Sequence, residues 1–249
     1  MPQKFMLIAC EILHREICLS AAHSKNIIDM TFLNKGLHDI GAKLMQETLQ
    51  KSVDGINVQK YDAILLGYGL CNYGVSGMVA KIPMVIPKAH DCITLFMGSK
   101  EKYRDYFDKN PGTFFRTAGW LERADFGIDG AENVMSQLGI QPDMDFSEYG
   151  EENAEYLKEM LGNWIGNYSK QTFIDTHVGN PAAYEKIIQE DTVSRGLEYE
   201  RIEGSIKLIQ RLMDGDWDEA DFLVVPPGGR ILATHDDGIM GYQEPQQPI

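Results

Sequence analysis

The chain has 249 residues, with 37 acidic against 23 basic side chains and a net charge of −14. Such an acidic surface disfavours nucleic acid and anionic membranes, because both bind clustered Lys and Arg, and the sequence contains no basic run. The apolar run at residues 5–10 is too short to span a bilayer and is followed by Glu11, so we expect a cytoplasmic protein whose thiols stay reduced.

Apolar runs in the first part of the chain predict buried strands that end close to metal-ligating residues. The carboxyl ends of parallel strands share one edge of a sheet, so these residues are expected to meet there. The strand at residues 5–10 ends at Cys10, the strand at 61–67 leads to Cys71, and the run at 82–86 leads to His90 and Cys92.

A further strand is predicted at residues 27–33 and a helix at 39–53, whose apolar residues lie on one side. His38 then lies beside a helix N-terminus at the strand edge, where it suits either a metal ligand or a proton-transferring group, and equally a helix cap. His14 and Cys18 follow Cys10 at helical i, i+4 spacing, but ordinary helix packing explains these two.

The second part of the chain repeats an alternation of strands and helices. Strands are predicted at 172–177, 197–204 and 221–230, with helices at 181–196 and 205–215. The segment 125–150 is predicted to be irregular, residues 151–166 carry a helical apolar stripe, and the tail from 241 onward is predicted to be frayed.

The expected fold is therefore α/β, with open, mostly parallel sheets in two βαβ-type halves and a cleft at the carboxyl ends of the strands. Residues 1–125 form the half that carries Cys and His, 126–170 a helical connector, and 171–249 the second half.

The leading hypothesis is a transition-metal site, most simply zinc, formed by Cys71, His90 and Cys92 with Cys10 or His38 as the fourth ligand. Paired C-x-x-C hooks are absent, so ligands from separate strand ends favour a site in a cleft of an already stable fold. Zinc there activates a bound thiol or water, as in methyl or acyl transfer, while Asp91 or His38 handles protons.

Glycine-rich segments predict where a small-molecule substrate or cofactor approaches the backbone. Gly69 lies in the loop before Cys71, although the pattern is not G-x-G-x-x-G. Gly228, Gly229 and Arg230 form a glycine turn at the end of the last predicted strand and are expected to meet a carboxylate or phosphate.

Two other interpretations remain open. The sequence around His38 is similar to the loop of corrinoid-binding modules whose histidine ligates cobalt, which predicts a corrinoid-binding protein or a carrier of metal or corrinoid. A two-cysteine racemase uses one cysteine from each lobe, but all four cysteines lie within residues 1–92, which argues against it.

Across nearly its whole length the chain resembles the DUF1638 family of uncharacterised prokaryotic proteins. The resemblance is carried by LIACEIL, GLHD, YGLCNYGVSG, PKAHDCITLFMGS and TAGW, and it is strongest from residue 5 to 122. Members often occur in anaerobes beside genes for methylamine and corrinoid methyl transfer. The resemblance thus implies a role near one-carbon metabolism and nothing sharper. If the protein is a carrier, we expect a corrinoid protein or a methyltransferase as its partner.

Overall fold

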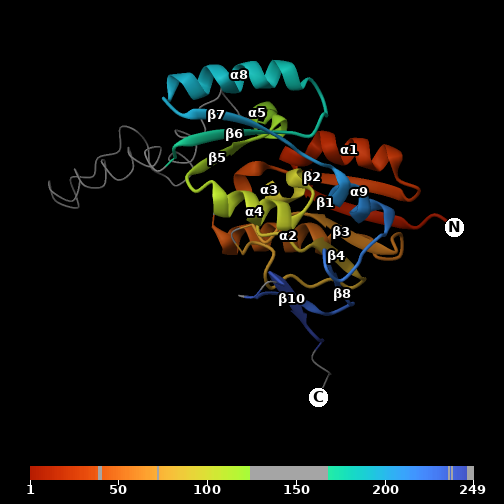
Figure 1. The fold of residues 1–249 in the computed structure, drawn as a ribbon. Coiled ribbons are helices and arrows are strands. Elements are labelled where there is room, and N and C mark those ends of the chain that lie inside the picture. Colours follow the sequence, from red (N-terminus) through yellow and green to blue (C-terminus); the bar gives the residue numbers. More distant parts are fainter. Residues whose placement is uncertain (39–40, 72, 124–167, 235, 237, 246–249) are drawn as a thin grey trace, which may run out of the picture.

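The computed structural model describes residues 1–38, 41–71, 73–123, 168–234, 236 and 238–245 (Figure 1). The predicted irregular segment at 125–150 and the predicted helix at 151–166 lie outside these residues, as does nearly all of the predicted connector.

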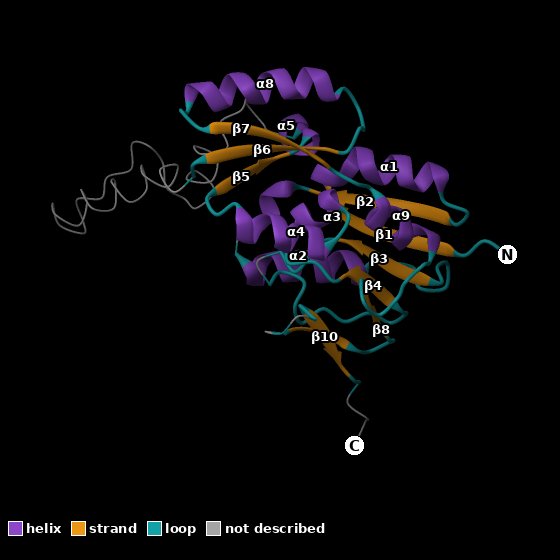
Figure 2. Ribbon diagram, in the orientation of Figure 1, coloured by secondary structure: helices purple, strands orange, loops and turns teal. Residues whose placement is uncertain are grey.

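Strands and helices alternate through most of the chain (Figure 2). The strands are β1 Lys4–Cys10, β2 Ile27–Leu33, β3 Ala63–Gly67, β4 Met84–Pro87, β5 Thr113–Arg116, β6 Lys170–Asp175, β7 Glu198–Glu203, β8 Phe222–Val225, β9 Arg230–Ala233 and β10 Met240–Gln243. The helices are η1 Glu11–Leu13, α1 His14–His23, η2 Lys35–His38, α2 Ala42–Asp54, α3 Cys92–Met97, α4 Lys100–Lys109, α5 Ala118–Glu122, α8 Pro181–Ser194 and α9 Lys207–Asp214.

The larger sheet has the strand order β2-β1-β3-β4-β8, in which β1 to β4 are parallel and β8 is antiparallel to β4. Every residue of β3 and β4 is buried, as expected for short apolar strands in the middle of a sheet covered on both faces. The crossovers from β1 to β2 and from β2 to β3 run in opposite directions, so right-handed connections put α1 and α2 on opposite faces. Helix α9 packs beside α1.

The smaller sheet has the order β5-β6-β7 and is entirely parallel. Because side chains alternate along a strand, its two faces meet different helices. Arg116 and Gln171 reach Asp191 of α8, whereas Thr172 accepts or donates a 2.8 Å bond with Tyr106 of α4. Figure 2 shows α8 and α4 on either side of this sheet. The predicted α/β class with mostly parallel open sheets is thus confirmed.

Strand membership does not follow the order of the chain. Strand β5, from the predicted first half, pairs with β6, and β8, from the predicted second half, pairs with β4. The chain therefore passes from the larger sheet to the smaller one through α3 and α4, and returns through α9.

The predicted frayed tail is wrong for residues 241–243, because β10 pairs antiparallel with β9 there. Ile231 of β9 is fully buried and Met240 of β10 nearly so, which supplies the packing that holds this hairpin. In the described part of the chain, no helix has both the length and the apolar character needed to cross a membrane.

Candidate metal site at the strand ends

The loops that follow β3 and β4 run side by side. Leu70 donates its backbone N–H to the oxygen of Ala89 at 2.7 Å, and Cys71 donates to the oxygen of His90 at 3.0 Å. Gly69 allows this approach, because a Cβ there would lie 2.9 Å from the oxygen of Ala89. The fold therefore brings Cys71 to the His-x-Cys segment. Gly69, predicted to bind a cofactor, acts here in loop packing.

Asp91 begins helix α3 as its N-cap. One of its oxygens accepts a bond from the backbone N–H of Ile93 at 2.9 Å, and the other accepts from the hydroxyl of Tyr103 at 2.8 Å. Burial raises the pKa of Asp91, while these bonds and one from the backbone of Thr94 oppose the rise. Both carboxylate oxygens thus have structural partners, which makes capping the observed role of this predicted proton-transfer residue.

The thiol of Cys71 lies in the core, only 3% exposed, although its backbone has a positive φ of 42°. The backbone N–H groups of Gly69 and Cys92 favour the thiolate and so lower the pKa of Cys71. Burial outweighs them and raises the pKa of Cys71. The thiol of Cys71 therefore resists ionisation, because the loop is covered by packing that the sequence pattern does not reveal.

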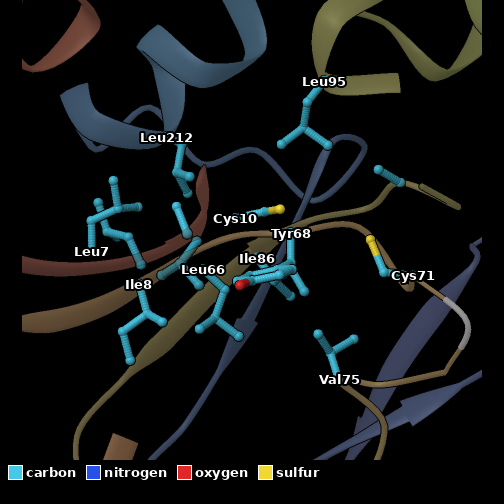
Figure 3. Packing of buried hydrophobic residues seen from close by; sticks show 14 of the residues in the cluster. Leu7, Ile8, Cys10, Leu66, Tyr68, Cys71, Val75, Ile86, Leu95 and Leu212 are labelled. Atoms are coloured by element: carbon cyan, nitrogen blue, oxygen red, sulfur yellow. The ribbon is translucent and has the colours of Figure 1, made fainter. Parts of the chain in front are cut away.

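Cys10 and Cys92 complete a cluster of three buried thiols with Cys71, called here the thiol cluster. Burial raises the pKa of Cys92 well above its ordinary value, and negative charge on Cys71, Asp91 or Cys10 adds to the rise. Each thiol therefore lies within electrostatic range of the other two. Figure 3 shows Cys10, Tyr68 and Cys71 in the same part of the core, where the Tyr68 hydroxyl has no hydrogen-bond partner in the described structure.

His90 differs from Cys92 in its surroundings. Its side chain is exposed and lines a cavity of about 310 Å³ beside α4, whereas Cys92 is only 7% exposed. His38 ends η2, and its side chain lies outside the described part of the structure. The same is true of Asp39 and Ile40, so the similarity to a corrinoid-binding loop stays a prediction.

Cys18 lies apart from the thiol cluster. Its sulfur is 3.9 Å from Nδ1 of His14, one helical turn earlier in α1, and it is half-buried. None of the four cysteines forms a disulfide, so all four thiols are reduced.

Gly228, Gly229 and Arg230 lie away from the thiol cluster. Strand β8 runs antiparallel to β4, so the turn that follows it lies toward the edge where the parallel strands begin. There Gly228 donates to the oxygen of Ala80 at 2.7 Å, and Arg230 donates to the oxygen of Gly77 at 3.3 Å. The expected grouping of this turn with the cysteines is not found.

Sequence reasoning missed the residues of α4 that line the cavity beside His90. Lys100, Tyr103, Arg104 and Phe107 follow one another at i, i+3, i+4 and i+7, which is the spacing of one helix face. This mixed polar and aromatic stripe is the feature of the sequence that could have identified these cavity residues.

The donor set suits zinc, because three reduced thiols and an imidazole arise from neighbouring strand ends. In the part of the chain that the structure describes, however, no three His, Cys, Asp or Glu side chains already stand in an arrangement that holds a metal ion. Metal binding at the thiol cluster therefore requires movement of the thiols as well as of exposed His90.

The family model described as a protein of unknown function (DUF1638) matches residues 32–213. This range contains Cys71, His90 and Cys92, but neither Cys10 nor Cys18. A comparison with the curated proteins gave no match. The solved structures gave none either.

Proposed function

Because the chain belongs to the DUF1638 family, whose function is unknown, we propose its function from the site itself: the thiol cluster binds one zinc ion. Cys71, Cys92 and His90, which turns inward from the neighbouring cavity, are three of the ligands. Cys10 is the fourth, and a substrate thiol or a water molecule displaces it. The observation that supports this most directly is the double attachment of the Cys71 loop to the loop of Cys92, through the backbone N–H of Leu70 to Ala89 and the backbone N–H of Cys71 to His90.

In this proposal the protein is an enzyme that transfers a methyl or acyl group to or from a small molecule. Zinc, when bound, lowers the pKa of a thiol or water molecule and so supplies a nucleophile at neutral pH. The chain contributes three buried thiols and, beside exposed His90, a cavity in which a small substrate is positioned. Asp91 holds the start of α3 and so fixes the loop that carries two of the ligands.

Metal analysis after anaerobic purification tests the proposal. We expect about one zinc ion per chain in the wild type and its loss in Cys71→Ala and Cys92→Ala, because each variant lacks a thiolate ligand. Cys18→Ala is the matched control, since this cysteine is reduced but lies outside the thiol cluster. It should keep its metal.

Metal content equal to wild type in both Cys71→Ala and Cys92→Ala would exclude the thiol cluster as the site. A pink or brown protein would instead indicate corrinoid or iron, and would overturn the choice of zinc. Far-UV circular dichroism on each variant separates loss of metal from loss of folding.

The raised pKa of the cluster thiols gives a second, independent prediction. Without metal the thiols of Cys71 and Cys92 are protonated at neutral pH, so zinc must displace protons to bind. Zinc affinity of the metal-free protein should therefore rise with pH from 6 to 8, at about tenfold per pH unit for each proton released. Competition with a chromophoric chelator measures this, and a flat profile would contradict thiol ligation.

A further inference from the structure

The cavity beside His90 is lined on one side by α4 and on the other by the start of α3 and the turn before β10. Its volume of about 310 Å³ is at the small end for ligand pockets, which fits a compact metabolite rather than a dinucleotide. It shares His90 with the proposed zinc site, so a molecule bound here lies next to that site.

The charge of this cavity is opposite to that of the molecule. Lys100 and Arg104 line it together with His90, against the single carboxylate of Asp108, in a chain whose net charge is −14. Lys100 also donates to the backbone oxygen of Ala220, which holds its ammonium group at the cavity wall. A local group of cations in an acidic protein attracts small anions.

Three further residues indicate that the cavity is shaped for a ligand. The Thr94 side chain is 1% exposed and lines the cavity, yet its hydroxyl has no hydrogen-bond partner in the described structure. Ile239 has a φ of 66°, which is rare for a β-branched residue, and such conformations concentrate where function requires them. Phe107 lines the cavity while 50% exposed. The cavity thus offers an apolar wall, an unused hydroxyl and positive charge.

We infer that this cavity binds a small organic anion, a carboxylate or a phosphate monoester, with its charged group between Lys100 and Arg104 and its apolar part against Phe107 and Ile239. The hydroxyl of Thr94 supplies a hydrogen bond to the ligand. The inference rests on the proposed function for the role of this anion as substrate, but binding itself requires only the cavity.

Isothermal titration calorimetry with three probes of similar shape tests whether the cavity prefers an anionic ligand to a neutral one. Phenylacetate and phenyl phosphate are the anionic probes, and phenylacetamide is the neutral probe. We expect at least one anion to bind about tenfold more tightly than the amide, because a hydrogen-bonded charge adds that much. The stronger of the two anions identifies the headgroup. Equal affinity for all three probes, or no heat with any of them, would overturn the inference.

Variants locate the binding. Lys100→Gln and Arg104→Gln should each weaken the preferred anion about threefold to tenfold and leave the amide unchanged, whereas Thr94→Val should weaken the ligand whatever its charge. Lys109→Gln is the control, because it removes a charge from the last turn of the same helix and does not line the cavity. An equal loss in Lys109→Gln would show that net charge alone attracts the anion and would overturn the inference.

The same titration on Cys92→Ala separates the two proposals. Anion binding in a protein without metal would support the cavity independently of zinc. A wild-type protein that holds zinc but no anion would keep the proposed function and reject this ligand class.

Discussion

Gly69 is the single residue on which the geometry of the thiol cluster depends most. A Cβ at this position would lie 2.9 Å from the oxygen of Ala89 and from the Cα of Asp91, and backbone atoms cannot move aside as a flexible side chain does. We expect Gly69→Ala to lower the free energy of unfolding by about 1–3 kcal/mol. It should also make Cys71 and Cys92 react faster with a thiol reagent, because the two loops separate.

Gly55→Ala is a matched control for that substitution. Gly55 caps α2 with a φ of −75°, and an added Cβ there would have only ordinary contacts at 3.6 and 3.7 Å. The control should therefore change stability by less than about 1 kcal/mol, and in the stabilising direction. Urea unfolding measures the change in the free energy of unfolding. Mass spectrometry of cysteines alkylated in the folded protein measures thiol reactivity. Unchanged thiol reactivity in Gly69→Ala would contradict the proposed role of this close approach.

At the scale of elements, the contact between α8 and the smaller sheet centres on one buried carboxylate. Asp191 accepts bonds from Arg116 at 3.2 Å, Gln171 at 2.9 Å and Arg195 at 2.7 Å, and the Arg116 and Asp191 side chains are only 7% and 6% exposed. We expect Asp191→Ala to destabilise the protein by about 3–5 kcal/mol, because it removes the buried carboxylate that Arg116, Gln171 and Arg195 share.

The preceding acid on the same helix gives the comparison. Glu190 is exposed and only 4.0 Å from Lys186 in a surface pair, so Glu190→Ala should cost about 0.5 kcal/mol or less. Urea unfolding of both variants measures the difference. Similar losses in the two would show that α8 depends on its helical charge pattern and not on the buried pair.

The elements of the larger sheet were largely predictable from the sequence, because apolar runs mark its strands, and those of β3 and β4 are buried throughout. The run at 27–33 is β2 with the same bounds, and the runs at 61–67 and 82–86 contain most of β3 and β4. What the pattern cannot give is the direction or the partner of a strand. The short apolar run of β8 fits either sheet, and its antiparallel pairing with β4 carried Gly228 and Arg230 away from the cysteines.

In the candidate site, the sequence predicted which loops meet but not the surroundings of their side chains. Parallel strand ends brought Cys71 beside the His90 loop, as the βαβ rule requires. The acidity of the thiols was not predictable, since it depends on packing over the loops. The cavity residues Lys100 and Arg104 were missed because a charged stripe on a helix is ordinarily a solvated face.

For the whole molecule, the two sheets are joined by contacts between residues far apart in the chain. A Cβ on Gly119 of α5 would lie 1.6 Å from the oxygen of Ile12, and Ser205 donates to the oxygen of Phe96 at 2.8 Å. A third contact of this kind joins Thr176 to Glu16, and it includes a titratable carboxylate. The hydroxyl of Thr176 donates to Glu16 at 2.7 Å, while the other carboxylate oxygen of Glu16 is buried without a partner in the described structure.

Burial raises the pKa of Glu16 above its ordinary value, and the bond from Thr176 only partly opposes this rise. At a pH between the two pKa values, the folded protein therefore keeps a proton on Glu16 that the unfolded chain releases. The stability that this proton contributes is complete below the ordinary glutamate pKa of about 4.3 and is lost as pH rises through the higher pKa of the folded state. Glu16 is thus a source of instability at neutral pH, located where the two sheets meet.

Glu16→Gln should remove this penalty, because the amide is neutral at every pH and its oxygen still accepts the bond from Thr176. We expect the variant to match the wild type near pH 4 and to exceed it by on the order of 1 kcal/mol at pH 8, measured by urea unfolding across that range. Glu47→Gln, at an exposed position of α2, controls for the loss of one negative charge. A difference between Glu16→Gln and wild type that stays constant from pH 4 to pH 8 would mean that folding does not shift the pKa of Glu16, and would contradict this account.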